Sequence, residues 1–259
     1  MPDPVPDTYV ALANRLAEAA GAVLRRYFRA RVAVDAKPDA TPVTVADREA
    51  ERAMRAILAE TAPGHGIVGE EEGRENDGAE YVWALDPIDG TKAYISGKPM
   101  FGTLIALARE GRPVIGIIDQ PVSRERWVGV TGRATTLNGA PAATRPCPDL
   151  AQAILNATTP DMFRGADRAR FARLAAAVRH ALYGGDCYAY GLLASGHIDL
   201  VVEAELKPYD FCALAPVIEG AGGRMTDWQG RALTLASDGR VVAAGDPTLL
   251  APALERLNA

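Results

Sequence analysis

The chain has 259 residues, 48% of them hydrophobic, and its formal net charge is −5. This length can bury a large core in one or two domains, and the acidic balance argues against nucleic acid or an anionic membrane as a partner. The three cysteines are scattered, and no apolar run approaches the roughly 20 residues that span a bilayer. Because residues 1–8 also lack the pattern of a secretion signal, we expect a soluble, cytoplasmic protein.

The chain is expected to begin with two helices, over residues 7–29 and 43–60. In the first, apolar residues recur at helical spacing opposite a charged face. At the second, Thr44 and Asp47 resemble a capping box, so Asp47 taken alone is explained more simply as a first-turn carboxylate than as a catalytic group. Between the helices, the pattern predicts a short strand over 31–35 and a proline-marked loop over 37–42.

Short strands dominate the rest of the first half. A strand over 67–69 leads into Glu70, the first of three consecutive glutamates, which usually mark a solvated loop. Residues 81–85 are apolar and rich in β-formers, which predicts a buried strand. An antiparallel meander follows, with strands over 101–108, 114–119, 126–131 and 134–137 and turns over 110–113 and 138–141.

In the second half, strands and helices alternate, which favours α/β layering. The expected strands cover 153–158, 198–202, 224–227 and 241–244, and the expected helices cover 167–180, 187–195, 209–220 and 247–257. A proline-rich run ends near residue 148 and suggests a domain boundary. We therefore predict an α+β N-terminal domain over 1–143 and an α/β C-terminal domain over 144–259.

A pair of carboxylates follows the buried strand, in the run Asp-Pro-Ile-Asp-Gly-Thr at residues 86–91. Two carboxylates at the end of a buried strand are costly unless cations compensate them, and Mg²⁺ takes oxygen ligands and commonly bridges to phosphate. A helical turn over 92–96 would also point the amides of Gly90 and Thr91 at an anion. The motif alone leaves a solvated turn open, just as Asp210 alone could be a helix cap.

Taken together, four segments resemble the inositol monophosphatase family of Mg²⁺-dependent phosphatases. They are residues 43–47 with Glu51 downstream, residues 69–71, residues 83–91, and Asp210 with the glycine-rich run 219–223. Tyr209 stands where the family usually has tryptophan, and the family's Glu-Ala-Gly-Gly is one residue longer here. The resemblance covers essentially the whole chain and implies a layered αβαβα fold, a metal site between the two halves, and a homodimer.

The resemblance also implies roles for individual residues. Glu70, Asp86 and the carbonyl of Ile88 would hold one Mg²⁺, and Asp86, Asp89 and Asp210 would hold a second. Thr91, oriented by Asp47, would deprotonate the attacking water together with Glu70. The substrate would be bound by Asp89, Gly90, Thr91, Asp186 and Glu203.

Within the family, residues 92–99, 116–121 and 185–190 are similar to the histidinol-phosphatases. This similarity implies Mg²⁺-dependent hydrolysis of L-histidinol phosphate to L-histidinol and phosphate in histidine biosynthesis. Two other phosphatase activities stay open, on inositol monophosphate and on 3′-phosphoadenosine nucleotides. A non-catalytic regulatory binding protein is a further alternative, against which the complete acidic ligand set argues.

Overall fold

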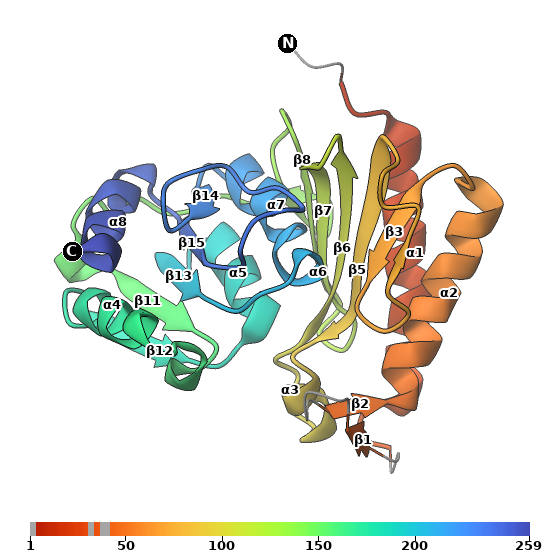
Figure 1. The fold of residues 1–259 in the computed structure, drawn as a ribbon, viewed down its shortest axis with the longest axis horizontal. Helices are drawn as coiled ribbons and strands as arrows, with labels where there is room; N and C mark the ends of the chain where they lie inside the picture. The colour runs from red at the N-terminus through yellow and green to blue at the C-terminus, as the bar shows by residue number, and fades with distance from the viewer. Residues whose placement is uncertain (1–3, 31–33, 37–41) are drawn as a thin grey trace.

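The computed structural model describes residues 4–30, 34–36 and 42–259, which fold into five alternating layers of helix and sheet (Figure 1). Helices α1 (Asp7–Tyr27) and α2 (Val45–Thr61) cover the outer face of an eight-stranded sheet. Helices α5 (Asp186–Ala194) and α7 (Leu214–Gly220) lie between that sheet and a five-stranded sheet. Helices α4 (Ala166–Ala175) and α8 (Leu250–Asn258) cover the far face. This is the predicted αβαβα arrangement.

The eight-stranded sheet has the order β10-β9-β8-β7-β6-β5-β3-β4, and all its pairs are antiparallel except β3 with β5. Its strands are β3 (Gly66–Gly69), β4 (Arg74–Glu75), β5 (Tyr81–Asp89), β6 (Gly102–Arg109), β7 (Arg112–Gln120), β8 (Glu125–Val130), β9 (Thr136–Leu137) and β10 (Ala140–Pro141). A separate antiparallel pair, β1 (Val34–Ala36) and β2 (Pro42–Thr44), leads into α2. The short helix α3 (Thr91–Ile95) follows β5.

The five-stranded sheet has the order β12-β11-β13-β15-β14, in which β11 pairs in parallel with both of its neighbours. Its strands are β11 (Ile154–Ala157), β12 (His180–Tyr183), β13 (Leu200–Glu203), β14 (Arg224–Asp227) and β15 (Val241–Ala244). The short helix α6 (Pro208–Phe211) precedes α7, and 3₁₀ turns cover Leu150–Gln152, Pro160–Met162 and Pro247–Leu249. All strands of the eight-stranded sheet precede residue 143, and all strands of the five-stranded sheet follow residue 144. The division of the chain into two domains between these residues stays a prediction.

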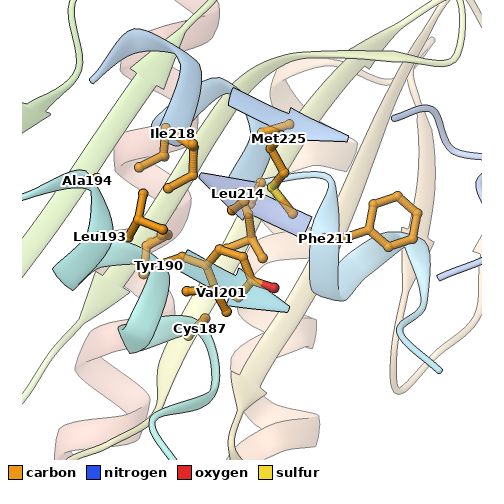
Figure 2. Packing of buried hydrophobic residues seen from close by; sticks show 14 of the residues in the cluster. Cys187, Tyr190, Leu193, Ala194, Val201, Phe211, Leu214, Ile218 and Met225 are labelled. Carbon is orange, nitrogen blue, oxygen red and sulfur yellow. The ribbon is translucent and has the colours of Figure 1, made fainter. Parts of the chain in front are cut away.

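The middle layer joins the two sheets through one buried apolar cluster, in which Tyr190 and Leu193 of α5 pack near Leu214 and Ile218 of α7 (Figure 2). Glycines in the larger sheet let α7 approach closely. A Cβ at Gly129 would lie 2.3 Å from the backbone nitrogen of Val217, so no side chain fits there. Among the described residues, no helix combines the length and hydrophobicity that a membrane span requires.

Several element boundaries differ from the prediction. Strand β5 continues past Pro87 to Asp89, because the missing N–H of the proline falls where the pairing register with β6 shifts. The helix expected over 167–180 ends at Ala175, and its last residues belong to β12 and the turn before it. Residues 74–75, expected in a loop, form β4.

The single helix expected over 209–220 is divided into α6 and α7. Pro216 lies in the first turn of α7, where its missing N–H costs no intrahelical hydrogen bond. The terminal helix begins with a 3₁₀ turn before α8. Of the strand expected over 31–35, residues 31–33 lie outside the described residues, as do residues 37–41 of the expected loop, while Pro42 belongs to β2.

Candidate functional site

Three aspartates from the two halves of the chain meet at one point. Asp86 and Asp89 come from β5 and Asp210 from α6, and one carboxylate oxygen of each lies within 4.8 Å of the others. Asp86 is 2% exposed. The structure thus brings together three of the carboxylates that the sequence assigned to a metal site.

Local hydrogen bonds hold these aspartates in place. The Thr103 hydroxyl donates to the Pro87 carbonyl at 2.9 Å, which fixes the irregular stretch between Asp86 and Asp89. Asp89 accepts the backbone N–H of Cys187 at the start of α5. Asp210 accepts the N–H of Lys207 at 2.7 Å, so it also serves as the helix cap that its position suggested.

The electrostatics of this cluster favour bound protons or a bound cation. Burial raises the pKa of Asp86 well above its usual value, and the charges of Glu70, Asp89 and Asp210 raise it further. Burial also raises the pKa of Asp210, to about 7. For Asp89, burial and then the charge of Asp186 raise the pKa. Carboxylates that repel one another in a buried site are neutralised either by protonation or by metal.

The donor set fits a hard divalent cation. All of the donors are carboxylate oxygens, which suit Mg²⁺ better than a softer metal. The Oδ1 atom of Asp86 is buried and accepts no hydrogen bond from the residues the structure describes. A cation would compensate both this oxygen and the mutual repulsion of the cluster.

Glu70 lies near the cluster, where its charge acts on Asp86 and Asp210, and Asp47 lies near Glu70. Asp47 is fully buried, and one of its oxygens accepts the N–H (2.8 Å) and the hydroxyl (2.7 Å) of Thr44, which completes the expected capping box. Burial raises the pKa of Asp47, and the charge of Glu70 contributes in the same direction. The Glu70 N–H donates to the Leu85 carbonyl at 3.1 Å, which ties this residue to β5 immediately before Asp86.

Thr91 does not donate to Asp47 as expected. Its hydroxyl donates to the Ile88 carbonyl at 3.1 Å. Asp47 Oδ1 is buried and has no hydrogen-bond partner among the described residues. The hydrogen bond between Asp47 and Thr91 that the resemblance implied is therefore not formed in this structure.

Gly90, Asp186 and Glu203, which the sequence analysis assigned to the substrate, lie close to the cluster, since Gly90 contacts Asp186 and the charges of Asp186 and Glu203 act on Asp89. Gly90 has φ of 92°, and a Cβ there would lie 3.0 Å from Asp186 Oδ2, so both conformation and space require glycine. Burial and then the charge of Glu203 raise the pKa of Asp186 to about 7, while Lys92 lowers it. Glu203 is 4% exposed and accepts the Thr158 N–H (3.1 Å) and the Tyr190 hydroxyl (3.0 Å).

A cavity of about 550 Å³ opens beside Asp186. Its other polar lining residues are Lys92, Ser96, Lys98, Thr158, Thr159, Asp161 and Tyr183. Asp161, Tyr183 and the partners of Glu203 were not identified from the sequence. They come from segments distant from the acidic motifs, and no local pattern marks them.

Comparisons with known proteins place this geometry in a family. The model of the inositol monophosphatase family matches residues 6–258. A chloroplastic bifunctional phosphatase of Arabidopsis thaliana, IMPL2, is 51% identical over 261 residues, which cover 97% of this chain and 75% of the relative. A histidinol-phosphatase of Chlorobaculum parvum is 35% identical over 245 residues, which cover 92% of each chain.

A solved structure with a similar fold belongs to the same kind of protein. The structure of an inositol monophosphatase from Zymomonas mobilis superposes with a TM-score of 0.90 at 50% identity, and the match covers 98% of each chain. The four acidic segments, the layered fold and the whole-length match agree with one another. This chain therefore belongs to the inositol monophosphatase family.

Proposed function

We propose that this protein is a Mg²⁺-dependent phosphomonoesterase that hydrolyses L-histidinol phosphate to L-histidinol and phosphate, a step of histidine biosynthesis. The observation that carries the catalytic part is the convergence of Asp86, Asp89 and Asp210 without a basic side chain paired to any of them in the described ranges. Membership of a phosphatase family supports the reaction class.

In this proposal the chain supplies the ligands of two ions. Glu70, Asp86 and the Ile88 carbonyl hold one, and Asp86, Asp89 and Asp210 hold the other. Bound Mg²⁺ would neutralise the phosphate, lower the pKa of a water and stabilise the leaving oxygen. Phosphoryl transfer of this kind needs positioning and charge stabilisation and no protein nucleophile.

The remaining residues orient the substrate and move a proton. Thr91 and Glu70 position the attacking water, and its proton passes to the Thr91 oxygen while the Thr91 hydroxyl passes its own proton to Asp47, toward which it turns when it releases the Ile88 carbonyl. The free oxygen of Asp47 supports this step. Asp89 and the amides of Gly90 and Thr91 face the phosphate.

The choice of substrate rests on charge. L-Histidinol phosphate carries an ammonium group and an imidazole, whereas inositol phosphate carries only hydroxyls beyond its phosphate. Asp186 and Glu203 are carboxylates on the proposed leaving-group side, and the adjoining cavity of about 550 Å³ has room for the organic part. The histidinol-phosphatase relative supports the same choice.

An inositol phosphate is the second candidate substrate, because the Zymomonas mobilis structure at 50% identity is described as an inositol monophosphatase. Phosphate release from histidinol phosphate, inositol monophosphate and 3′-phosphoadenosine phosphate, measured side by side with Mg²⁺, tests both. We expect activity that chelator abolishes and Mg²⁺ restores, with the highest kcat/KM on histidinol phosphate. Equal efficiency on inositol monophosphate would overturn the substrate assignment, and no hydrolysis of any ester would overturn the enzymatic proposal.

We also propose that the protein acts in the cytoplasm as a homodimer. Each chain of the dimer would consist of two domains, over residues 1–143 and 144–259. Family resemblance is the support for the dimer. Sedimentation of the purified protein and microscopy of the tagged protein test the two statements.

A further inference from the structure

Glu51 is a buried carboxylate that the proposed chemistry does not use. Its side chain is fully buried on α2, one helical turn after Asp47. Both positions therefore lie on the same face of the helix, the face that meets the acidic loop after β3. A charged group is costly to bury unless its oxygens are satisfied, so the partners of Glu51 indicate its role.

Those partners are the backbone of the loop that carries Glu70. The N–H of Glu71 donates to Glu51 Oε2 at 2.7 Å, and the N–H of Glu72 donates to Oε1 at 3.0 Å. Arg55, one turn further along α2, donates from Nε to Glu51 Oε1 at 2.8 Å. These three contacts occupy both oxygens of Glu51, so this carboxylate is fixed on the loop.

The loop is fastened at its far end as well. Arg55 Nη2 donates to the Gly73 carbonyl at 2.6 Å, and the N–H of Gly69 donates to the same carbonyl at 2.9 Å. A Cβ at Gly69 would lie 2.1 Å from Glu51 Oε1, so the backbone of the loop lies directly against the carboxylate. Glu70 is thus held between β5, through the Leu85 carbonyl, and the carboxylate of Glu51.

We propose that Glu51 is a positioning residue that holds the Glu70 carboxylate in its metal-binding orientation. The proposal rests on the metal site proposed above. Glu51 acts through the backbone of residues 71 and 72, and Arg55 keeps its carboxylate in place. Without this contact two N–H groups lose their acceptor and the loop is free to move Glu70 away from Asp86.

The test is divalent-ion binding, measured by calorimetry with Mg²⁺ or Mn²⁺ on the full chain. Glu51→Gln keeps the size of the side chain but turns an N–H₂ group toward one loop N–H. Hydrogen bonds to charged groups account for roughly ten- to a hundredfold in an equilibrium constant, and we expect the metal Kd to rise by about that factor. The matched control is Glu49→Gln, because Glu49 is an α2 glutamate that contacts Arg26 and Tyr27 of α1 and leaves the loop untouched.

A double-mutant cycle separates positioning from general destabilisation. If Glu51 acts through Glu70, Glu51→Gln adds little to the metal Kd in a Glu70→Gln background. If Glu51→Gln does not fold, Arg55→Gln removes the bond to Gly73 and should raise the Kd in the same direction by a smaller factor. A folded Glu51→Gln or Arg55→Gln variant with a lower Tm but wild-type Kd would overturn the proposal. Wild-type protein that binds no divalent ion would overturn the metal site itself and this proposal with it.

Discussion

Two kinds of buried aspartate lie in this protein, in opposite electrostatic surroundings. The Asp199 side chain is 1% exposed, yet it accepts two hydrogen bonds from Arg145, at 2.8 and 2.7 Å, and one from the Ile154 N–H at 2.8 Å. Burial would raise the pKa of Asp199, but these bonds outweigh burial and hold the pKa below its usual value. Asp86 and Asp89 are surrounded by other carboxylates, and their pKa values are raised.

Asp199 shows that the fold can satisfy a buried carboxylate with an arginine and a backbone N–H. The chain contains 28 lysines and arginines, so basic partners are plentiful. Within residues 4–30, 34–36 and 42–259, none of them forms an ion pair with Asp86, Asp89 or Asp210. Such an arrangement costs stability and is typical of a site that awaits a ligand.

The largest expected effect is on enzymatic activity, where substitution of Asp86 and substitution of Asp199 should have different consequences. Asp86→Asn removes the carboxylate proposed to bridge both ions, and kcat/KM with saturating Mg²⁺ should fall on the order of a thousandfold, since metal catalysis supplies several kcal/mol. Asp199→Asn should leave kcat/KM of the folded protein unchanged. Near-wild-type turnover of Asp86→Asn at saturating Mg²⁺ would show that the bridging role is wrong.

A smaller effect is expected at Thr91. Its hydroxyl donates to the Ile88 carbonyl in the resting structure, and in the proposal it turns to Asp47 during the reaction, so that the Thr91 oxygen can accept from the attacking water. Thr91→Ala should lower kcat by about a hundredfold and leave KM nearly unchanged, because a group that moves a proton acts in the transition state. Thr91→Ser, which keeps the hydroxyl, is the control. A raised KM with intact kcat would instead make Thr91 a phosphate-binding residue only.

Substrate choice is expected to depend on Glu203, a carboxylate that already accepts two hydrogen bonds within the protein. Glu203 accepts bonds from Thr158 and Tyr190 and keeps capacity for an ammonium group. Glu203→Gln should lower kcat/KM roughly ten- to a hundredfold for histidinol phosphate and much less for an uncharged aryl phosphate. Glu205→Gln is the matched control, because Glu205 is 49% exposed and pairs with Arg164. Equal losses on both substrates would exclude Glu203 from amine recognition.

Some of this architecture could be predicted because the signals are local. Strands β14 and β15 were predicted with their exact bounds, since β-forming runs are bounded by glycine or polar turns. The predicted strand ended at residue 85, because the proline at 87 suggests a stop, whereas in β5 this proline lies at an irregularity in the pairing. Strand β12 was missed because the helix was expected to run to His180, where β12 begins, and the strand is only four residues long and mostly exposed.

The site divides in the same way. The carboxylates of the acidic segments could be predicted, because their residue types and their order along the chain indicate a metal site. The contacts that place them carry no such signal, because the Cys187 N–H that Asp89 accepts comes from a segment 98 residues away, and the Tyr190 hydroxyl that Glu203 accepts comes from α5. They depend on the packing of α5 between the two sheets (Figure 1), which no local pattern encodes.

The smallest expected effect is on stability, and it has opposite signs at Asp210 and Asp199. The folded-state pKa of Asp210 is about 7, above its unfolded value, so the folded protein binds this proton more tightly. In the metal-free protein, the contribution of Asp210 to stability is therefore fully present below its unfolded pKa of about 3.9. This contribution is lost as the pH rises toward 7. Asp199 has a lowered pKa, so its contribution is present at neutral pH and is lost as the pH falls through the folded pKa.

Thermal melts in chelator at pH 5 and pH 8 test this difference. Asp210→Asn should raise the Tm at pH 8 and change it little at pH 5, where the native aspartate already holds its proton. Asp199→Asn should lower the Tm at both pH values, because it weakens the pairing with Arg145. We expect shifts of a few degrees, since 1 kcal/mol moves the Tm of a domain of 150–250 residues by roughly 2–4 °C. Excess Mg²⁺ should reverse the sign at Asp210 alone, because the wild-type carboxylate then stabilises the protein by binding the ion, and an Asp210→Asn variant that stays more stable than wild type in Mg²⁺ would argue against Asp210 as a ligand.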